Sequence, residues 1–485
     1  MKLCELIFKD EYISASLNME EAVDKVTVKP EECDENTLLI IPGENKNPSL
    51  LFNLHARALV CGIDVEVLCN IPIIRVKNSR RCAAYIFSRF SKIDYSRLKI
   101  IGITGTNGKS STAEFTKCAL EGCGIKVGVI GTGRILIGGE AKSEDYYSMT
   151  TPDPWILYPA LKEMEKCGCE AVVMEISSHA LALEKVAPIP FDIAVFTNLS
   201  KEHLDFHKTT ENYYSAKKKL FYQAKLKIIN IDDCYGRRLA RELQSDKITV
   251  GVLWRGEVYS SNIEKHGFDG IRYMYHGKNF TFKLNLHTAG VFNIYNSMLA
   301  ITAATALGAP PYKVKKALSE LVMIKGRYEI IKDEITVIID YAHTDTALEN
   351  ILRSIREVKR HDQNLTVVFG CGGERDTEKR PRMAKIAETY ADQIVVTNDN
   401  SRGERTEDII FDIVSGFEKK RHTVIADRRA AIEYAIKRTE RKGIVAIIGK
   451  GAELYNIDKD GYHPFDERTI IKEALIERAR LRNEN

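Results

Sequence analysis

The chain lacks the features that mark membrane and secreted proteins. It has no run of about 18 uninterrupted apolar residues, which a membrane-spanning helix needs, and the N-terminal stretch MKLCELIFKDEY has no long apolar signal region. Its 11 cysteines are odd in number and contain no CxxC pair, so they fit neither a disulfide framework nor a zinc site. We therefore expect a protein of the reducing cytoplasm without a membrane span.

A large excess of charge of one sign is also missing. The 71 Lys and Arg residues and the 67 Asp and Glu residues give a formal charge of +4. This near balance argues against a nucleic-acid partner, because the basic excess of a nucleic-acid-binding protein is usually concentrated. With 44% hydrophobic and 28% charged residues, the composition is that of a globular protein that can bury a sizeable core.

The length and the order of apolar segments predict three α/β domains, at residues 1–97, 98–325 and 326–485. In the first, strand candidates at 37–43 and 71–78 accompany a helical segment at 80–90. The polar stretch 91–98 then separates this domain from the next.

From residue 99 onward, short apolar strands alternate with segments of helical length. This alternation is typical of a doubly wound parallel sheet with helices on both faces. The expected strands of the central domain are KIIGIT, KVGVIGTG, EAVVMEIS, DIAVFTNLS and LKIINID. Between about 247 and 288, short alternating segments with Gly and Asn turns predict a small β-hairpin extension.

The C-terminal block is expected to be a Rossmann-like α/β domain. Its strand candidates are TVIIDYA, LTVVFGCGG, QIVVTND, HTVIA and IVAIIGKG. Each ends in small or polar residues, and ligands of such sheets bind at the carboxyl ends of the strands.

The stretch GITGTNGKSS (102–111) follows a strand and leads into a helix. It departs from the common G-x-x-x-x-G-K-[ST] pattern, because Ile103 stands where that pattern needs glycine. It still supplies backbone N–H groups at a helix N-terminus, a lysine for phosphates and a hydroxyl for Mg²⁺, so the central sheet is expected to be of the P-loop type. A plain glycine-rich turn would not need Lys109 and Ser110 together.

A dinucleotide-binding dehydrogenase is the rival interpretation. Its G-x-G-x-x-G fingerprint fails at GTGRIL (131–136) and at GKGAEL (449–454), because both lack the third glycine.

GTNGK[TS] after a strand resembles the ATP loop of the Mur ligases, the ATP-dependent amide-forming enzymes of peptidoglycan precursor synthesis. The resemblance covers the second and third expected domains, and it is closest to the branch that adds the third residue of the stem peptide. The segments that carry it are MTTPDP (149–154), MEISSHAL (174–181), FTNLSKEHLDFH (196–207), YYSAKKKLF (213–221), GVFNIYN (290–296), GRYE (326–329), DYAHT (340–344), FGCGGERD (369–376), DNSR (399–402) and GKGAE (449–453).

The resemblance implies an ATP site with Mg²⁺ at two positions. Lys109 would bind the phosphates, and Lys217 would be carbamylated so that its side chain becomes an anion. The implied metal-binding residues are Ser110, Glu175, His203 and Lys217, of which Glu175, His203 and Lys217 are also catalytic candidates together with Lys109. The implied ATP-binding residues are Gly105, Thr106, Asn107, Gly108, Lys109, Ser110, Ser111, Asn293, Asn296, Arg327, Asp340 and His343.

Each of these residues also has a purely structural interpretation. Residues 217–219 could form a solvated basic patch, a carboxylate at a strand end could be an ion-pair partner, and the two asparagines could be cap or packing residues.

Two substrates are implied as well, a UDP-linked muramoyl dipeptide and a free diamino acid. The candidates for the peptide end are Thr150, Thr151, Ser177 and Lys185, and those for the amino acid are Arg375, Asp399, Asn400, Ser401, Arg402, Gly449 and Glu453. A diaminopimelate side chain ends in an ammonium and a carboxylate, and an acid and an arginine together would bind such a group. Arg402 therefore favours meso-diaminopimelate over L-lysine.

The resemblance thus implies a monomeric ligase that adds meso-diaminopimelate to UDP-N-acetylmuramoyl-L-alanyl-D-glutamate and releases ADP and phosphate. An L-lysine-adding ligase, an amide ligase of a secondary pathway, a folylpolyglutamate synthetase and a non-catalytic nucleotide-binding relative are the alternatives. The chain departs from the usual family pattern at Ser401 (proline), Ala452 (histidine), Leu183 and Lys185, and at TVKPEEC (27–33), where relatives carry Asp-Ser-Arg.

Overall fold

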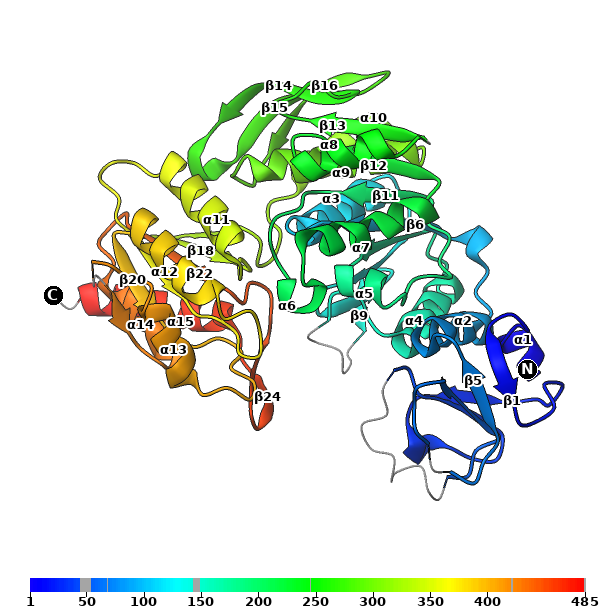
Figure 1. The fold of residues 1–485 in the computed structure, drawn as a ribbon. Coiled ribbons are helices and arrows are strands. Elements are labelled where there is room, and N and C mark those ends of the chain that lie inside the picture. Colours follow the sequence, from blue (N-terminus) through cyan, green and yellow to red (C-terminus); the bar gives the residue numbers. More distant parts are fainter. Residues whose placement is uncertain (44–53, 68, 143–148, 245, 420–421, 484–485) are drawn as a thin grey trace.

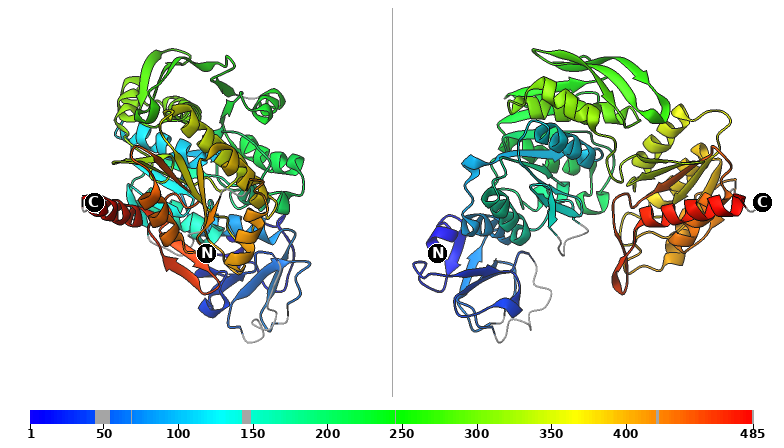
Figure 2. Two further views of the ribbon diagram at one scale, coloured as in Figure 1. Left: turned by 90° about the vertical axis from the view of Figure 1, so that its left-hand side faces the viewer. Right: turned by 180° about the vertical axis from the view of Figure 1, so that it is seen from behind.

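The computed structural model describes residues 1–43, 54–67, 69–142, 149–244, 246–419 and 422–483. It has mixed α/β architecture with three main sheets and one two-stranded sheet. The N-terminal and C-terminal parts lie on different sides of the central part, as the ribbon views show (Figures 1 and 2). The predicted three-domain α/β fold is therefore confirmed.

The N-terminal part is a five-stranded sheet in the order β1-β5-β4-β3-β2. Helix α2 follows the last strand and is capped by Asn78, whose side chain accepts a hydrogen bond from the backbone N–H of Arg81. The elements are α1 (Leu3–Leu6), β1 (Tyr12–Ala15), β2 (Lys25–Thr27), β3 (Thr37–Ile40), β4 (Ala58–Gly62), β5 (Ile73–Val76) and α2 (Ser79–Ser91).

The central sheet has 11 strands in the order β16-β15-β14-β13-β12-β11-β6-β10-β7-β8-β9. The strands from β14 to β7 in this order are parallel, and antiparallel strands extend both edges. The first elements are β6 (Lys99–Thr104), α3 (Lys109–Glu121), β7 (Val127–Gly131), β8 (Arg134–Ile137), β9 (Glu140–Lys142), α4 (Pro154–Lys166), β10 (Ala171–Glu175), α5 (Ser178–Ala182), β11 (Ile193–Phe196) and α6 (Leu204–His207). The remaining ones are α7 (Thr210–Gln223), β12 (Leu226–Asn230), α8 (Cys234–Glu242), β13 (Lys247–Gly251), β14 (Val258–Lys265), β15 (Ile271–His276), β16 (Thr281–Leu286), α9 (Phe292–Ala306) and α10 (Pro311–Glu320).

The expected hairpin extension is present but shorter than predicted. Strands β14, β15 and β16 form an antiparallel meander, whereas β13 pairs in parallel with β12 after the crossover through α8. The interpretation of 247–251 as part of a hairpin was therefore wrong. Its apolar residues belong to the parallel sheet, because α8 returns the chain to the edge next to β12.

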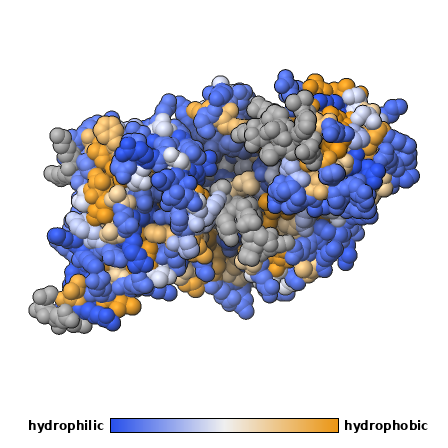
Figure 3. All heavy atoms as spheres, turned by 90° about the horizontal axis from the view of Figure 1, so that it is seen from below, coloured by the Kyte–Doolittle hydropathy of each residue, from blue (hydrophilic) through white to orange (hydrophobic). Residues whose placement is uncertain are grey.

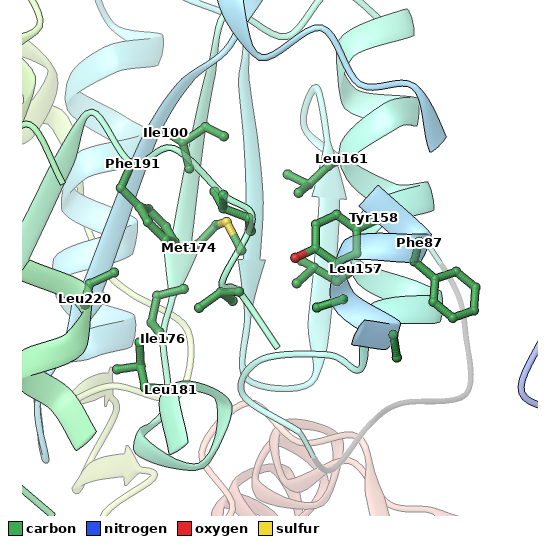
Figure 4. Packing of buried hydrophobic residues seen from close by; sticks show 14 of the residues in the cluster. Phe87, Ile100, Leu157, Tyr158, Leu161, Met174, Ile176, Leu181, Phe191 and Leu220 are labelled. Atoms are coloured by element: carbon green, nitrogen blue, oxygen red, sulfur yellow. The ribbon is translucent and has the colours of Figure 1, made fainter. Parts of the chain in front are cut away.

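Strand residues of the central sheet alternate between two cores, one on each face. Val172 and Met174 of β10 face the core formed by α4 and α7, whereas Ala171 and Val173 face the core formed by α3, α9 and α10. Such alternation follows from the two-residue period of a strand. Figure 4 shows the first core, in which Tyr158 of α4 lies between the sheet and Phe87 of α2. Helix α2 therefore joins the N-terminal part to the core of the central domain.

The C-terminal sheet has six strands in the order β17-β18-β22-β19-β20-β21, parallel except for β17. Helices α11, α12 and α13 cover one face and α14 and α15 the other. The elements are β17 (Glu329–Lys332), β18 (Thr336–Asp340), α11 (Asp345–Val358), β19 (Leu365–Phe369), α12 (Lys379–Tyr390), β20 (Gln393–Val396), α13 (Thr406–Val414), β21 (Thr423–Val424), α14 (Arg428–Arg438), β22 (Ile444–Ile448), β23 (Tyr455–Asp458), β24 (Gly461–Pro464) and α15 (Glu467–Asn483).

The connection between β14 and β15 reaches the C-terminal domain. Lys265 Nζ lies 2.5 Å from Glu357 Oε2 of α11, and Asp269 forms an ion pair with Lys332 of β17. Phe268, between these two residues, packs against the core under α11. These contacts join the edge of the central sheet to the C-terminal domain at a point outside the nucleotide loop.

The surface is largely hydrophilic on the face shown in Figure 3, with apolar residues interspersed among polar ones. Among the residues that the structure describes, no helix combines the length and the apolar character that crossing a bilayer requires.

We predict that Leu157→Ala destabilises the central domain, because this fully buried residue of α4 fills the core shown in Figure 4. Removing a large aliphatic side chain from a packed core costs about 2–5 kcal/mol of unfolding free energy. Denaturant unfolding followed by circular dichroism measures the loss, with Lys166→Ala on the exposed face of α4 as the control. Equal stability of the two variants would contradict the prediction.

Candidate active site

Residues that directly follow β11 form hydrogen bonds with the loop between β6 and α3. The backbone N–H of Asn107 donates to Asn198 Oδ1 at 2.9 Å, and that of Thr106 donates to the carbonyl of Asn198 at 2.9 Å. Thr197 Oγ1 donates to the carbonyl of Asn107 at 2.6 Å. Parallel strands place their carboxyl ends at one edge, so the residues after β11 can fix the loop after β6.

Two glycines of this loop leave no space for a side chain. A Cβ atom at Gly105 would lie 1.8 Å from Thr197 Oγ1, and one at Gly108 would lie 2.5 Å from Asn296 Oδ1. Gly108 also has a φ of +83° and precedes α3, which has no side-chain cap. The first N–H groups of α3 are therefore left for a ligand, and a helix N-terminus of this kind favours phosphate.

Two lysines converge on the carbonyl of Gly105. Lys109 Nζ donates to it at 2.9 Å and to the carbonyl of Thr106 at 2.8 Å, and Lys217 Nζ donates to the Gly105 carbonyl at 2.9 Å. Burial lowers the pKa of Lys109, and burial together with the charge of Lys109 lowers the pKa of Lys217 well below its usual value. Lys217 is only 1% exposed, so it is not part of a solvated basic patch.

Oxygen atoms gather beside the start of α3. Ser110 Oγ donates to Glu175 Oε2 at 2.7 Å, and the Thr132 hydroxyl donates to the same oxygen at 3.2 Å. Glu175 ends β10 and is buried. A carboxylate and hydroxyls are the hard oxygen donors that Mg²⁺ prefers, so this group fits a magnesium ion next to the phosphate loop. Within the described residues, no three His, Cys, Asp or Glu side chains are grouped closely enough to form a metal site by themselves.

Glu202 lies between two histidines from different domains. Its Oε1 is 3.7 Å from His203 Nε2 of the central domain and 3.6 Å from His343 Nε2 of the C-terminal domain. Burial acts to raise the pKa of Glu202, but the nearby His343 imidazole and the positive charge of Lys109 hold it well below its usual range. Burial lowers the pKa of His203 to about 4, which leaves its imidazole neutral at pH 7 and able to bind a metal.

Arg327 crosses from the start of the C-terminal domain to the phosphate loop. Its Nη2 donates to Ser110 Oγ at 2.8 Å, and its guanidinium lies over the ring of Tyr341 at 4.3 Å. Asp340 accepts from the backbone N–H groups of Tyr328 and Ala342 at 2.7 and 2.8 Å, and burial raises its pKa. Arg327 and His343 are therefore in contact with the central domain, whereas Asp340 holds the backbone around Arg327.

The asparagine pair of α9 lies next to the loop. Asn296 Nδ2 donates to Asn293 Oδ1 at 3.3 Å, Asn293 Nδ2 donates to the carbonyl of Ala289 at 2.8 Å, and the Thr112 hydroxyl donates to Asn296 Oδ1 at 3.3 Å. Ser111, at the start of α3, is buried. Both asparagines are thus engaged with the protein, and Asn296 is also adjacent to Gly108.

The residues expected at the peptide end surround the end of β10. Thr151 Oγ1 donates to the carbonyl of Glu175 at 2.9 Å and accepts from the Ser177 N–H at 3.0 Å, while Thr150 Oγ1 lies 3.2 Å from Thr132 Oγ1. Ser177 Oγ caps α5. Lys185 lies beyond α5, where its Nζ is 2.6 Å from Asp153 Oδ1.

The residues expected at the amino-acid end form a second group, at the carboxyl ends of β19, β20 and β22. Asn400 Nδ2 donates to Glu453 Oε2 at 2.9 Å, and Arg402 Nη1 donates to the carbonyls of Gly373 and Asn400 at 2.8 and 3.2 Å. A Cβ atom at Gly449 would lie 2.5 Å from Asp399 Oδ2, so the loops after β20 and β22 are in close contact. Ser401 is buried in the loop that follows β20.

Charge links this second group to the central domain. Burial and the charge of Arg402 lower the pKa of Arg375, while Asp205 of the central domain acts on it in the opposite direction. Burial and the charge of Asp399 raise the pKa of Glu453. The two groups of expected residues therefore belong to different domains that meet at Glu202, Arg327 and His343.

Sequence reasoning missed several residues of the site. Asn198 and Glu202 stand inside the segment FTNLSKEHLDFH, from which only His203 was selected, and Lys450 directly follows the selected Gly449. Thr132 follows the end of β7, and its role depends on the contact with Glu175. The signal available for Thr132, Asn198 and Lys450 was their position just after a strand, whereas Glu202 lies six residues beyond the end of β11.

Comparison with known proteins identifies the family. Residues 103–304 match the Mur ligase middle domain, and residues 326–451 match the Mur ligase glutamate ligase domain. The UDP-N-acetylmuramoyl-L-alanyl-D-glutamate--2,6-diaminopimelate ligase of Aquifex aeolicus (strain VF5) is 41% identical over 417 residues, which cover 85% of each chain. The enzyme named UDP-N-acetylmuramoyl-L-alanyl-D-glutamate--2,6-diaminopimelate ligase 1 of Clostridium acetobutylicum is 36% identical, with 98% of this chain and 100% of the relative covered.

Solved structures agree with this grouping. A structure of UDP-N-acetylmuramoyl-L-alanyl-D-glutamate--2,6-diaminopimelate ligase superposes with a TM-score of 0.68 at 25% identity and covers 99% of both chains. The folylpolyglutamate synthase of Mycobacterium tuberculosis shares the fold, with a TM-score of 0.64 at 16% identity over 76% of this chain and 92% of that one. The chain belongs to the Mur ligase family.

Proposed function

We propose that this chain is an ATP-dependent ligase of peptidoglycan synthesis that joins meso-diaminopimelate to UDP-N-acetylmuramoyl-L-alanyl-D-glutamate and releases ADP and phosphate. The relatives that share 36–41% of its residues carry this activity in their names. The observation that carries the proposal is the uncapped start of α3 with Lys109 and the Ser110–Glu175 pair beside it, which provides for phosphate and for a divalent cation together.

ATP binds with its phosphates at the start of α3. The N–H groups of Gly108 to Ser111 and the ammonium of Lys109 take the phosphate oxygens, and Lys109 exchanges its bonds to Gly105 and Thr106 for them. The adenine lies against Asn293 and Asn296 of α9, next to Gly108. Arg327, His343 and Asp340 approach the ribose and phosphates from the C-terminal domain.

Ser110 and Glu175 would hold one Mg²⁺, and His203 with a carbamylated Lys217 would hold a second. When bound, the ions neutralise charge on the phosphates and on the reacting carboxylate. The neutral Lys217 amine, in a site where burial lowers its pKa, is the form that reacts with CO₂. Its nitrogen would bond to the carbon of CO₂ as one C=O π bond breaks, and the nitrogen would release a proton to water, so the site would gain a carbamate anion.

The reaction has two steps, both at the edge where β6, β10 and β11 end. A carboxylate oxygen of the D-glutamate side chain attacks the γ-phosphorus, the bond to the bridging oxygen breaks, and ADP leaves. The amine of the diamino acid then attacks the acyl carbon, loses a proton and expels phosphate. Lys109 stabilises the charge of the phosphoryl group during its transfer, and Thr150, Thr151 and Ser177 hold the peptide end.

The diamino acid binds at the ends of β19, β20 and β22. Arg402 and Arg375 bind carboxylate, whereas Glu453 accepts the ammonium that does not react, with Asp399, Asn400, Ser401 and Gly449 forming the surrounding loops. L-Lysine has no distal carboxylate for Arg402.

The N-terminal domain (1–97) binds the uridine diphosphate, with 98–325 as the ATP domain and 326–485 as the amino-acid domain. We further infer a monomer that acts in the cytoplasm, the compartment that the odd number of cysteines without a CxxC pair favours.

We predict that phosphate release depends on meso-diaminopimelate. The purified protein is given ATP, Mg²⁺, the UDP-linked dipeptide and one amino acid at a time, and released phosphate is measured. Diaminopimelate supports release and L-lysine does not, because only the former has a carboxylate for Arg402. Release with lysine alone would reject the specificity, and no release with any amino acid would reject the ligase function.

We also predict that Lys217→Ala lowers turnover by about a hundredfold or more, because it removes the group that becomes the carbamate. Lys218→Ala is the matched control, since Lys218 is only partly buried and pairs with Glu242 at 2.8 Å away from the loop. The measurement is kcat for phosphate release by variants whose circular dichroism is unchanged. Equal turnover of the two variants would remove the carbamate from the mechanism.

A further inference from the structure

Lys450 is a fully buried lysine in the C-terminal domain. It follows Gly449 after β22, and its side chain is 0% exposed. Its Nζ donates to Asn400 Oδ1 at 2.7 Å and to the carbonyl of Tyr455 at 3.0 Å. A lysine is almost never fully buried unless its charge is paired, because removing an ammonium from water is costly.

The hydrogen bonds of Lys450 connect three segments of the C-terminal domain. Asn400 belongs to the loop after β20, Lys450 to the loop after β22, and Tyr455 to β23. Asn400 Oδ1 also accepts from the Ile457 N–H at 3.0 Å, and its Nδ2 donates to Glu453 Oε2 at 2.9 Å. Asn400 is therefore one of the groups that position the Glu453 carboxylate, together with the hydroxyls of Tyr341 and Tyr455, and Lys450 and the Ile457 N–H fix the orientation of the Asn400 amide.

The backbone of the loop after β20 is held in an unusual conformation by hydrogen bonds from neighbouring segments. Arg402 has a φ of +53°, a left-handed conformation that a side chain with Cβ rarely adopts, and its N–H donates to the carbonyl of Ile457 at 3.1 Å. Ser401 does not restrict the backbone as a proline would. The side chain of Arg402 thus keeps its direction because neighbouring segments hold the backbone.

The charges around Lys450 do not balance within the cluster. Its Nζ lies 3.6 Å from Asp399 Oδ1 and 3.8 Å from Glu453 Oε2, so one ammonium faces two carboxylates. Arg428 is the other cation that acts on Asp399, and it forms a buried ion pair with Glu467 at 2.7 Å. The charges of Lys450 and Arg428 hold the pKa of Asp399 at about 2 although burial acts to raise it, whereas burial raises the pKa of Glu453. Two cations thus compensate the charge of Asp399, whereas Glu453 lies 3.8 Å from Lys450 and can also accept a cationic group of the substrate.

We propose that Lys450 is a positioning residue for amino-acid specificity, which holds Asn400 and Glu453 so that the Glu453 carboxylate meets the non-reacting ammonium of the diamino acid. The inference rests on the proposed function for the identity of the substrate. Lys450 itself does not touch the substrate, because its ammonium is enclosed by Asn400, Tyr455 and the two carboxylates.

The test compares Lys450→Met and Lys450→Gln with the wild type in steady-state assays of phosphate release. Lys450→Met raises the KM for meso-diaminopimelate about tenfold or more, as loss of a charge-assisted hydrogen bond at a binding site does. The KM values for ATP and for the UDP-linked dipeptide stay the same. Lys450→Gln recovers part of the loss, because its amide can still donate to Asn400.

A second readout separates positioning from general stability. 2-Aminopimelate lacks the non-reacting ammonium, so the wild type prefers meso-diaminopimelate to it and Lys450→Met loses this preference. Lys227→Met is the matched control: Lys227 is also buried, donates to the carbonyl of Lys225 at 2.9 Å, and lies on β12 of the central domain. We expect this control to leave the preference unchanged.

Hydrogen–deuterium exchange tests the same idea without any substrate. Lys450→Met speeds exchange in peptides that cover 399–402 and 455–458, where the amides of Arg402 and Ile457 are bonded. Unchanged exchange, an unchanged KM for the diamino acid, or an equal rise of the KM for ATP would overturn the proposal. Loss of folding in both Lys450 variants would also overturn it, in favour of a purely structural role. A wild type that releases no phosphate with any diamino acid would instead reject the proposed function, and the exchange result would still decide the positioning role.

Discussion

The sharing of the Gly105 carbonyl by Lys109 and Lys217 is the interaction on which the site depends. Two buried ammonium groups repel each other, and this repulsion together with burial favours the neutral form of Lys217. The carboxylates of Glu175 and Glu202 act in the opposite direction on Lys109. Phosphate groups beside Lys109 and an anion on Lys217 would both remove this repulsion between the two lysines.

The remainder of the central domain keeps this arrangement in place. Asn198 and Thr197 fix the loop because β11 is the parallel neighbour of β6, and Glu175 reaches Ser110 because β10 is its neighbour on the other side. The order of three strands thus brings together a phosphate loop, an acid and a histidine. The two glycines of the loop permit this approach, since a side chain at either position would collide with the end of β11 or with α9.

The strands that could be predicted from the sequence are those marked by a short run of apolar residues. The apolar segments became β6, β7, β10, β11 and β12, because strands buried on both faces need uninterrupted apolar residues. The parallel pairing of β13 with β12 was not predictable, since it depends on where α8 returns the chain to the sheet. The site residues show the same difference between local and tertiary effects. Lys109 could be predicted because it stands in a recognisable loop sequence. The neighbouring sequence does not show that Lys217 is buried while Lys219 is exposed, or that Lys450 faces two carboxylates. The pairing of such groups is set by tertiary structure.

The contacts between the 265–269 segment and the C-terminal domain have a mechanical consequence. Lys265 with Glu357, Asp269 with Lys332 and Phe268 hold one corner of that domain to the edge of the central sheet, while β24 lies at its far end in Figure 1. A rigid body that is attached at one corner can turn about that corner with little displacement nearby and a large displacement at the opposite end. A rotation of the C-terminal domain about the 265–269 segment would therefore displace β23 and β24 the most, and it would also have to break the contact between Arg327 and Ser110.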